Sequence, residues 1–388
     1  MGTSELQDLI DRIHSKAESD GYRGFDPYDI KSLPFFRKWS NIRYLGFAQD
    51  RLLSVAPNLV RTLFRVTPGL NAKALALFGN GYITLHEVSG NKVWVERARS
   101  VLSRLKEMQT QWGEGIGWGY PFDWQSKVFF PAGTPSGVVT SFCLKALTRY
   151  KNLTRSHEFD DQIRLAAHFL ATGLQKYVPA HDKVCFSYTP LDNMRVHNAN
   201  VLTAAALMEA FDSLGDRSFL ELAVKAFNYT ISEQKTDGSW YYFGDTEGVP
   251  GYIDNYHTGF VLRALLIYRG HCGGREVESA LQKGLHYYKE ALFFDRFLPR
   301  FSNRVKHPVD VHACGDSLAT LSAFSRFDPD CLGVAQNLLE WSVRHLYDGM
   351  GGFYYQKYPL FTSRISYMRW NNAWMFYGLT EYLRAFSK

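Results

Sequence analysis

Residues 198–211 read NANVLTAAALMEAF, and this stretch decides the fold because close variants of it recur along the chain. It starts with polar residues, continues through small and apolar ones and ends on an aromatic. The same pattern occupies residues 137–150, 258–268, 313–324 and 371–382. The closing aromatics follow one another at intervals of about 58 residues, a period in the range of helical-hairpin repeats. Small residues let neighbouring backbones approach closely, so we predict inner helices of a repeat array at these places.

A more charged segment follows each inner stretch and carries its apolar residues on one side, which is typical of a half-exposed outer helix. Counting back by one period adds an inner helix over residues 71–86. The predicted outer helices cover residues 92–109, 159–176, 218–233, 274–292 and 333–345. Six hairpins can close into a ring with a central funnel. We therefore predict an all-α (α/α)6 toroid over residues 71–388, with residues 1–70 as an N-terminal helical extension packed on it.

The composition fits a well-packed protein and argues against several classes of function. Aromatic residues make up 15% of the chain, and such residues pack cores but also line sugar sites. The net charge of +6 is spread along the chain without a dense Lys/Arg run, which argues against nucleic acid as a partner. The five cysteines are odd in number and lack Cys-x-x-Cys spacing, which favours a reducing compartment over a disulfide framework or zinc knuckle.

The N-terminal region bears on the location of the protein. Residues 1–19 are polar and amphipathic rather than signal-like, and no run approaches the roughly 20 apolar residues of a membrane span. We expect a cytoplasmic protein. A basic helix predicted over residues 41–66 carries Arg43, Arg51, Arg61 and Arg65 between apolar residues. It is either a solvated face packed on the ring or a membrane-surface or partner-binding helix, and the second alternative would make the protein membrane-peripheral.

One loop motif supports the ring independently of the period. Residues 234–240, QKTDGSW, resemble the QxxDGSW repeat of squalene and oxidosqualene cyclases and their prenyltransferase relatives, which build α/α toroids. In this motif Gly permits a tight turn, Asp accepts backbone donors and Trp wedges between hairpins. The sequence lacks the DxDD string that cyclase chemistry requires, and the zinc-ligand patterns of protein prenyltransferases and lanthionine cyclases do not match either. The resemblance therefore implies the ring and not the chemistry.

Four further segments resemble a poorly characterised bacterial α/α-toroid family that is associated with capsule and exopolysaccharide biosynthesis. They are residues 24–29 (GFDPYD), 117–124 (GWGYPFDW), 253–260 (IDNYHTGF) and 369–374 (RWNNAW). Some members of that family carry a porphobilinogen-synthase label, which does not fit, because that enzyme is a β/α barrel and nothing here alternates strand with helix. The resemblance implies a surface-polysaccharide context.

Polar clusters stand where the loops reach the inner helices, and in a ring such loops converge on one mouth of the funnel. Three histidines recur there, His197, His257 and His312. A His near a helix N-terminus has no capping advantage and its cation is disfavoured by the helix dipole, so the recurrence indicates a site. We predict His257 as the base, Tyr256 or His312 as the proton donor and His197 as a further catalytic candidate. The histidines come from three hairpins without an HExxH-type pair, so we predict no metal, and no motif indicates a cofactor.

Basic and aromatic residues at the same edge suit an acidic saccharide or sugar conjugate, because cations neutralise the acid group and aromatic faces stack on sugar C–H surfaces. Asn and Asp at these positions would also serve as helix N-caps. The predicted substrate-binding residues are Asp254, Asn255, Arg195, Asp310, Arg364, Arg369, Asn371, Trp118, Tyr120, Asp123, Trp124, Trp240 and Trp370.

The leading hypothesis is an enzyme of surface-polysaccharide biosynthesis that modifies an acidic sugar as an epimerase or a lyase. Similar toroids are used by uronate epimerases, polysaccharide lyases and N-acyl-glucosamine epimerases. Arg369 and Asn255 would neutralise the carboxylate and thereby acidify the neighbouring C–H bond. Two alternatives stay open. One is a noncatalytic toroid that binds a glycan or a glycosyltransferase, and the other is a glycoside hydrolase with Asp123, Asp254 and Asp310 as candidate carboxylates.

Overall fold

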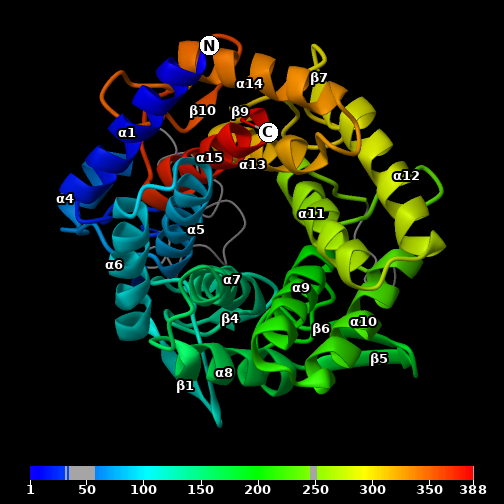
Figure 1. Cartoon of the computed structure of the whole chain (residues 1–388). Helices are drawn as coiled ribbons and strands as arrows, with labels where there is room; N and C mark the ends of the chain where they lie inside the picture. The colour runs from blue at the N-terminus through cyan, green and yellow to red at the C-terminus, as the bar shows by residue number, and fades with distance from the viewer. Residues whose placement is uncertain (31–32, 35–56, 245–250, 388) are drawn as a thin grey trace.

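The computed structural model of the chain describes residues 1–30, 33–34, 57–244 and 251–387. Its helices form two concentric layers that close into a ring (Figure 1). The predicted all-α toroid is confirmed. Within the described part of the chain, no helix is long and apolar enough to cross a membrane.

The inner layer of the ring consists of six helices in the described residues, each beside the next. They are α5 (Ala72–Ser89), α7 (Gly137–Thr154), α9 (His197–Leu214), α11 (Asn255–His271), α13 (Val311–Phe324) and α15 (Trp374–Phe386). A short π-helical turn, η3 (Met368–Ala373), leads into α15. Because α15 also contacts α5, the last inner helix closes the ring on the first. The inner helices therefore lie where the repeat predicts them.

Small residues allow the inner helices to pack this closely. A Cβ atom added to Gly315 of α13 would lie 2.6 Å from the backbone of Trp374 at the start of α15. A Cβ atom added to Gly378 of α15 would collide with the carbonyl group of Gly315. Real Cβ atoms do not approach backbone atoms this closely, so the two glycines determine how near α13 and α15 can lie.

The outer layer contains helices that follow the inner ones in sequence. They are α6 (Val93–Met108), α8 (Asp160–His168), α10 (Arg217–Ser232), α12 (Arg275–Ala291) and α14 (Asp330–Leu346). The helix predicted over residues 159–176 ends earlier, because after its π-helical continuation η1 (Phe169–Gly173) the backbone turns extended at Leu174. Glycine favours such an ending, since it is a poor helix former.

The first helix of the chain belongs to the outer layer as well. Helix α1 (Thr3–Ser19) packs against α15 and so takes the outer place beside the last inner helix (Figure 1). The ammonium group of Met1 lies 2.9 Å from the carboxylate of Glu340 in α14. The chain is thereby fastened to itself where the ring closes, and the division at residue 70 into extension and toroid stays a prediction.

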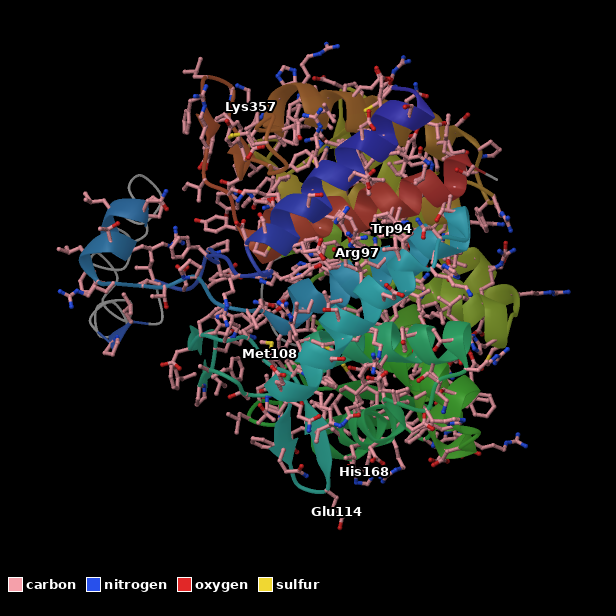
Figure 2. The ribbon with its side chains drawn as sticks, turned by 60° about the vertical axis from the view of Figure 1, so that its left-hand side comes forward. Trp94, Arg97, Met108, Glu114, His168 and Lys357 are labelled. Carbon is pink, nitrogen blue, oxygen red and sulfur yellow. The ribbon has the colours of Figure 1, made fainter. Side chains whose placement is uncertain are left out.

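Short antiparallel strands occupy the loops that run from an outer helix to the next inner helix. They are β1 (Thr110–Trp112) with β2 (Gly115–Gly117), β3 (Trp124–Gln125) with β4 (Phe129–Phe130), β5 (Lys176–Ala180) with β6 (Lys183–Phe186), β7 (Phe293–Phe294) with β8 (Leu298–Pro299), and β9 (Val309–Asp310) with β10 (Gln356–Lys357) and β11 (Thr362–Ser363). In Figure 2, Met108 at the end of α6 lies nearer than Trp94 to the side that holds α4 (Pro57–Leu63). We call this side, where outer helices end and inner helices begin, the loop end of the ring.

The QKTDGSW motif serves the architecture as predicted. The Asp237 carboxylate accepts a hydrogen bond from the backbone N–H of Ser239 at 3.0 Å, and Gly238 has a φ of 91°. The indole of Trp240 packs against Gly284 of α12, where an added Cβ atom would lie 2.8 Å from the ring. The Trp therefore wedges between consecutive hairpins.

Only part of the predicted basic helix falls within the described residues. Residues 41–56, with Arg43 and Arg51, lie outside them. The described part is α4, and there Arg61 is 2% exposed, with its Nη2 atom 2.9 Å from the Asp29 carboxylate. The expectation that this arginine lies on a solvated or membrane-facing side is therefore wrong, because its charge is buried and paired.

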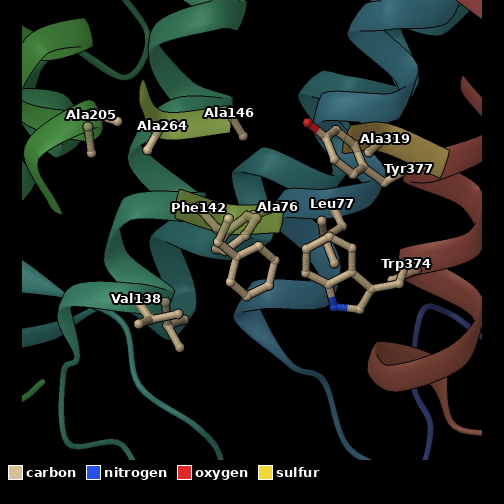
Figure 3. Packing of buried hydrophobic residues seen from close by; sticks show 14 of the residues in the cluster. Ala76, Leu77, Val138, Phe142, Ala146, Ala205, Ala264, Ala319, Trp374 and Tyr377 are labelled. Atoms are coloured by element: carbon tan, nitrogen blue, oxygen red, sulfur yellow. The ribbon is translucent and has the colours of Figure 1, made fainter. Parts of the chain in front are cut away.

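An aromatic layer fills the centre of the ring. Figure 3 shows Phe142 of α7 and Trp374 of α15 turned toward one another across the centre, with ring centroids 5.5 Å apart. Phe260 of α11 completes the layer at 5.9 Å from Phe142 and 5.4 Å from Trp374. Phe260 lines two cavities, one of about 110 Å³ and one of about 40 Å³, and Phe142 lines the second. The layer thus separates a larger pocket at the loop end from a smaller one beyond it.

Candidate active site

The larger cavity, which we call the central pocket, is built almost wholly from aromatic and cationic side chains. Its lining residues are Tyr28, Lys73, Tyr120, Phe122, Trp124, Val138, Tyr188, Asn198, Tyr242, Tyr256, His257, Phe260, His312, Arg369 and Trp370. Among these described residues there is no carboxylate. Aromatic faces suit the C–H surfaces of a sugar ring, and the cations suit an anionic group.

His257 is held in one orientation by the residue that caps its helix. Asp254 is the N-cap of α11, and its Oδ1 atom accepts a hydrogen bond from the backbone N–H of His257 at 2.8 Å. Its Oδ2 atom lies 2.6 Å from Nδ1 of the same His257. A carboxylate at this place favours the tautomer with the proton on Nδ1, so Nε2 carries the lone pair. The Asp254 side chain is fully buried, whereas that of His257 is 22% exposed, so His257 can receive a proton from a ligand in the pocket.

His312 lies deeper and is enclosed by aromatic rings. Its imidazole stacks on Trp370 at 4.5 Å and meets Trp374 edge-on at 4.6 Å. Burial, together with the nearby cations of Lys73 and Arg369, lowers the pKa of His312 well below its ordinary value. Neither ring nitrogen has a hydrogen-bond partner among the described residues. Buried polar atoms are rarely left so, and a ligand in the pocket could provide the partner.

Tyr256 connects the two histidines. Its ring centroid lies 4.2 Å from that of His257 and 4.4 Å from that of His312. Burial raises the pKa of Tyr256 well above its ordinary value. The phenol therefore carries its proton at neutral pH.

Asp310 lies behind the pocket wall and positions two of its members. It is the N-cap of α13 and accepts a hydrogen bond from the backbone N–H of His312 at 2.9 Å. The same Oδ1 atom accepts from the indole N–H of Trp370 at 2.9 Å, and Gln356 donates to Oδ2 at 2.7 Å. Burial raises the pKa of Asp310 to about 6. Asp310 thus orients the histidine and the tryptophan without lining the pocket.

Arg369 reaches the pocket as half of a buried ion pair. Its Nε and Nη2 atoms lie 2.6 and 2.8 Å from the two carboxylate oxygens of Asp26. Burial lowers the pKa of Arg369, but the charge and hydrogen bonds of Asp26 outweigh it and hold that pKa above its ordinary value. The guanidinium carbon also lies 5.1 Å from the ring centroid of Tyr120. Asp26 therefore compensates the charge of Arg369. The Nη1 group of Arg369 makes no hydrogen bond within the described chain.

Lys73 is a pocket residue that sequence reasoning missed. It lies in the first turn of α5 and is 3% exposed. Its Nζ atom is 4.5 Å from the ring centroid of Phe142. The signal available was a single cation at the start of an otherwise small and apolar inner helix. A single lysine forms no repeating pattern, so the period that places the inner helix over residues 71–86 does not single it out.

Most of the other lining residues missed from the sequence are aromatic. Tyr28 and Phe122 stand in segments whose family resemblance was noted, and their rings are 5.8 Å apart. Tyr188 and Tyr242 come from loops between hairpins. Isolated tyrosines in loops carry no pattern that separates them from the other aromatics of such a chain.

Four predicted substrate-binding residues are buried and use their side-chain donors within the ring. Asn255 donates to a backbone carbonyl at 3.2 Å and Asn371 at 2.7 Å. The indole N–H groups of Trp118 and Trp240 donate to backbone carbonyls at 2.7 and 2.8 Å. None of these four residues lines the central pocket. They fasten loops to helices instead.

Three further predicted residues lie outside the central pocket. The guanidinium of Arg195 is 4.6 Å from the ring centroid of Tyr177, and that of Arg364 is 5.8 Å from the ring centroid of Tyr354. The Asp123 carboxylate accepts from a backbone N–H at 2.8 Å. Of the predicted substrate-binding residues, the structure therefore places Tyr120, Trp124, Arg369 and Trp370 at the pocket itself.

The three histidines do not form one site. His197 is 3% exposed and stacks on Tyr229 at 5.7 Å. It borders a separate cavity of about 10 Å³, whose wall also includes His257. Only His257 and His312 line the central pocket. Among the described residues, no three His, Cys, Asp or Glu side chains are grouped so that they could hold a metal ion.

Comparisons with known proteins bear on the fold. No protein-family model and no curated protein matches the chain. The cellobiose 2-epimerase from Bacillus thermoamylovorans is similar in structure, with a TM-score of 0.65 at 11% identity over 82% of this chain and 87% of that one. A D-mannose isomerase has a TM-score of 0.61 at 11% identity, over 81% and 86% of the two chains. An unsaturated glucuronyl hydrolase specific for heparin has a TM-score of 0.58 at 12% identity, over 80% and 85%. At such identities the likeness shows a shared fold, the α/α toroid of these enzymes.

Proposed function

We propose that the chain is a sugar-modifying enzyme that epimerises an acidic saccharide by moving a proton at the carbon next to the carboxylate. The observation that carries the proposal is the pairing of Asp254 with His257 in the central pocket. That pocket also holds His312, whose ring nitrogens have no hydrogen-bond partner among the described residues. Such a carboxylate and imidazole pair is a general base held in place. Two structures that share the fold are named as a sugar epimerase and a sugar isomerase, which supports proton transfer as the reaction type.

The reaction would proceed through one charged intermediate. Nε2 of His257 takes the proton from the α-carbon, and the electron pair moves into the carboxylate to give an enediolate. Arg369 and His312 donate hydrogen bonds to its oxygens, and one preorganised donor of this kind contributes roughly 10²–10³ in kcat. Tyr256 returns a proton to the opposite face of the carbon. The proton that His257 gained then returns to the phenolate of Tyr256 and completes the cycle.

The size of the pocket supports epimerisation over polymer cleavage. The cavity measures about 110 Å³, whereas ligand sites usually measure about 300–1,000 Å³. A single sugar ring suits such a space better than the several residues that a polysaccharide lyase holds. A lyase would use the same base, however, and differs in that a group leaves the neighbouring carbon.

Hydrolysis is less well supported. A glycoside hydrolase of the usual kind needs two carboxyl groups beside the scissile bond. Of the three candidates, Asp254 and Asp310 are N-caps behind the wall, and Asp123 accepts from a backbone N–H. In the described chain, none of them lines the central pocket.

The proposed setting is the biosynthesis of a bacterial surface polysaccharide. It rests on the resemblance of residues 24–29, 117–124, 253–260 and 369–374 to the capsule-associated family. The name of a third structure with this fold, the glucuronyl hydrolase, supports an acidic saccharide as the ligand. A noncatalytic toroid that binds a glycan does not account for a carboxylate-held imidazole in the pocket.

The test is NMR of uronate-containing saccharides incubated with the protein in deuterated water. Deuterium at the carbon next to the carboxylate, together with the epimer, is the expected result. A double bond in the sugar ring would indicate a lyase instead. Binding of a saccharide without either change would show a noncatalytic toroid and overturn the proposal.

A further inference from the structure

We infer that Lys73 is the residue that receives the acid group of the ligand, so that it determines specificity for acidic over neutral saccharides. This inference deepens the proposed function and rests on its acidic saccharide, yet binding alone tests it. No sequence pattern or resemblance had assigned a role to Lys73.

The surroundings of Lys73 give its ammonium no oxygen partner. Its Nζ atom lies 4.5 Å from the ring centroid of Phe142 and 5.2 Å from those of Phe260 and Trp374. Within the described residues, Nζ makes no hydrogen bond and no ion pair. Aromatic faces attract a cation by roughly 2 kcal/mol when it is desolvated, but they do not replace the hydration that a buried ammonium loses.

Three features of the fold work against a positive charge at this place. The side chain is 3% exposed, so it is largely removed from bulk water. It stands in the first turn of α5, where the helix dipole disfavours a cation. Burial and the charges of Arg369 and Arg263 lower the pKa of Lys73 well below its ordinary value. An anion bound at Nζ would offset all three.

The neighbouring cations already have carboxylate partners, unlike Lys73. Arg369 pairs with Asp26 at 2.6 Å, and Arg263 pairs with Asp316 at 2.6 Å. Each of these pairs is neutral as a unit. In the part of the chain that the structure describes, Lys73 is therefore the basic side chain of the central pocket that has no carboxylate partner and is left for an acidic ligand.

Two further side chains of the pocket await hydrogen-bond partners. Both ring nitrogens of His312 and the Oδ1 atom of Asn198 are buried without one in the described structure. His312 is 2% and Asn198 3% exposed. The three residues belong to α5, α9 and α13 and line one cavity. A ligand with one anionic group and several hydroxyls would satisfy them together, which is the chemistry of a uronic acid.

The bound arrangement assigns separate tasks to the residues. Lys73 takes a carboxylate oxygen at the floor of the pocket, against the aromatic layer. Asn198 accepts a hydrogen bond from a sugar hydroxyl through Oδ1. His257, nearer to solvent, then faces the carbon next to the carboxylate. Lys73 would thus position the acidic sugar for the base.

The experiment compares the affinities of acid and neutral sugars by isothermal titration calorimetry. The probes are D-glucuronate, D-galacturonate and D-mannuronate, each measured against the corresponding neutral hexose at constant ionic strength. We expect the wild-type protein to bind at least one acid more tightly than its neutral counterpart. In Lys73→Met that preference should fall by about tenfold to a hundredfold, because a charge-assisted hydrogen bond is lost.

A second lysine at the ring centre provides the matched control. Lys145 of α7 lines the smaller cavity beyond the aromatic layer, so Lys145→Met should keep the acid preference. Lys73→Gln, which removes the charge but keeps a polar side chain, serves if Lys73→Met does not fold. Retention of the preference in a folded Lys73 variant would overturn the inference, and so would a wild-type protein that binds no acid better than its neutral counterpart.

The outcome is separable from that of the proposed reaction. A preference for acids that depends on Lys73, without exchange of the α-proton, would support the inference and refute the proposed enzyme activity. Incorporation of deuterium into the sugar, without a preference for acids that depends on Lys73, would support the proposed enzyme activity and refute the role of Lys73.

Discussion

Nδ1 of His257 lies 2.6 Å from one oxygen of Asp254, while the backbone N–H of the same His257 donates to the other oxygen at 2.8 Å. One carboxylate thus caps α11 and orients the imidazole. Capping and catalysis are usually weighed as rival explanations of an Asp before a helix. Here both follow from a single side chain, because the third residue of the helix is a histidine.

His312 provides a test that separates ligand binding from stability. Its ring nitrogens have no hydrogen-bond partner within the described structure, so His312→Phe removes no internal hydrogen bond. We expect the free energy of unfolding to change by less than about 1.5 kcal/mol. Proton exchange should fall by about 10²-fold or more, because a donor to the enediolate is lost. Urea denaturation and deuterium NMR measure the two effects, and near-normal exchange in the folded variant would show that His312 takes no part.

The ion pair between Arg369 and Asp26 predicts a large loss of stability. Both side chains are under 10% exposed, so Asp26→Asn leaves a buried guanidinium charge unpaired. We expect the free energy of unfolding to fall by about 3–5 kcal/mol. As control, Asp20→Asn removes the partner of Lys16 in an exposed pair and should cost less than about 1 kcal/mol. Equal effects of the two variants in urea denaturation would contradict the buried pair.

Asp310 predicts a specific dependence of stability on pH. Its pKa is about 6 in the folded protein, where burial raises it from 3.8. Between these two values the folded state binds more protons than the unfolded state, so this group lowers stability as pH rises from about 4 to 6. In Asp310→Asn the dependence should be missing. The stability of wild type relative to this variant should therefore fall by roughly 3 kcal/mol across that window. A constant difference between the two proteins would contradict the raised pKa.

Two glycines test the packing of the ring. Gly378 of α15 faces the carbonyl of Gly315, and a Cβ atom there would collide with it. Gly333 of α14 has nothing within 4 Å of an added Cβ atom. We expect Gly378→Ala to lower the free energy of unfolding by about 1–3 kcal/mol and Gly333→Ala to raise it by about 0.5–1 kcal/mol. Changes of the same sign in both variants would be inconsistent with this packing.

The sequence predicts the ring well because the signal is repeated. Small residues such as Gly315 and Gly378 recur on every inner helix and reflect a requirement of close packing that each hairpin shares. The outer helix that packs against α15, the last inner helix, could not be predicted in this way. It is α1, whose last residue, Ser19, precedes the first residue of α15, Trp374, by 355 residues. Sequence proximity gives no indication of that pairing.

The site is predicted less well, because the period places residues along the ring but does not fix their rotation about the helix axis. His197, His257 and His312 are the first, third and second residues of their helices. Each step along a helix turns the side chain by about 100°. His257 and His312 line the central pocket, whereas His197 packs against Tyr229.

The most direct test of the account concerns the base that it assigns. The rate of deuterium exchange at the carbon next to the carboxylate is measured for wild type, His257→Gln and Asp254→Asn. His86→Gln is the control. His86 lies at the far end of α5, away from the pocket, and its Nδ1 atom is 3.0 Å from the backbone carbonyl oxygen of Asn91. Asn is a good N-cap, so Asp254→Asn should remain folded.

We predict exchange in wild type and in His86→Gln, and a loss of about 10²–10⁴-fold in His257→Gln and Asp254→Asn. Exchange at the wild-type rate in a folded His257→Gln protein would contradict the assignment of this histidine as the base.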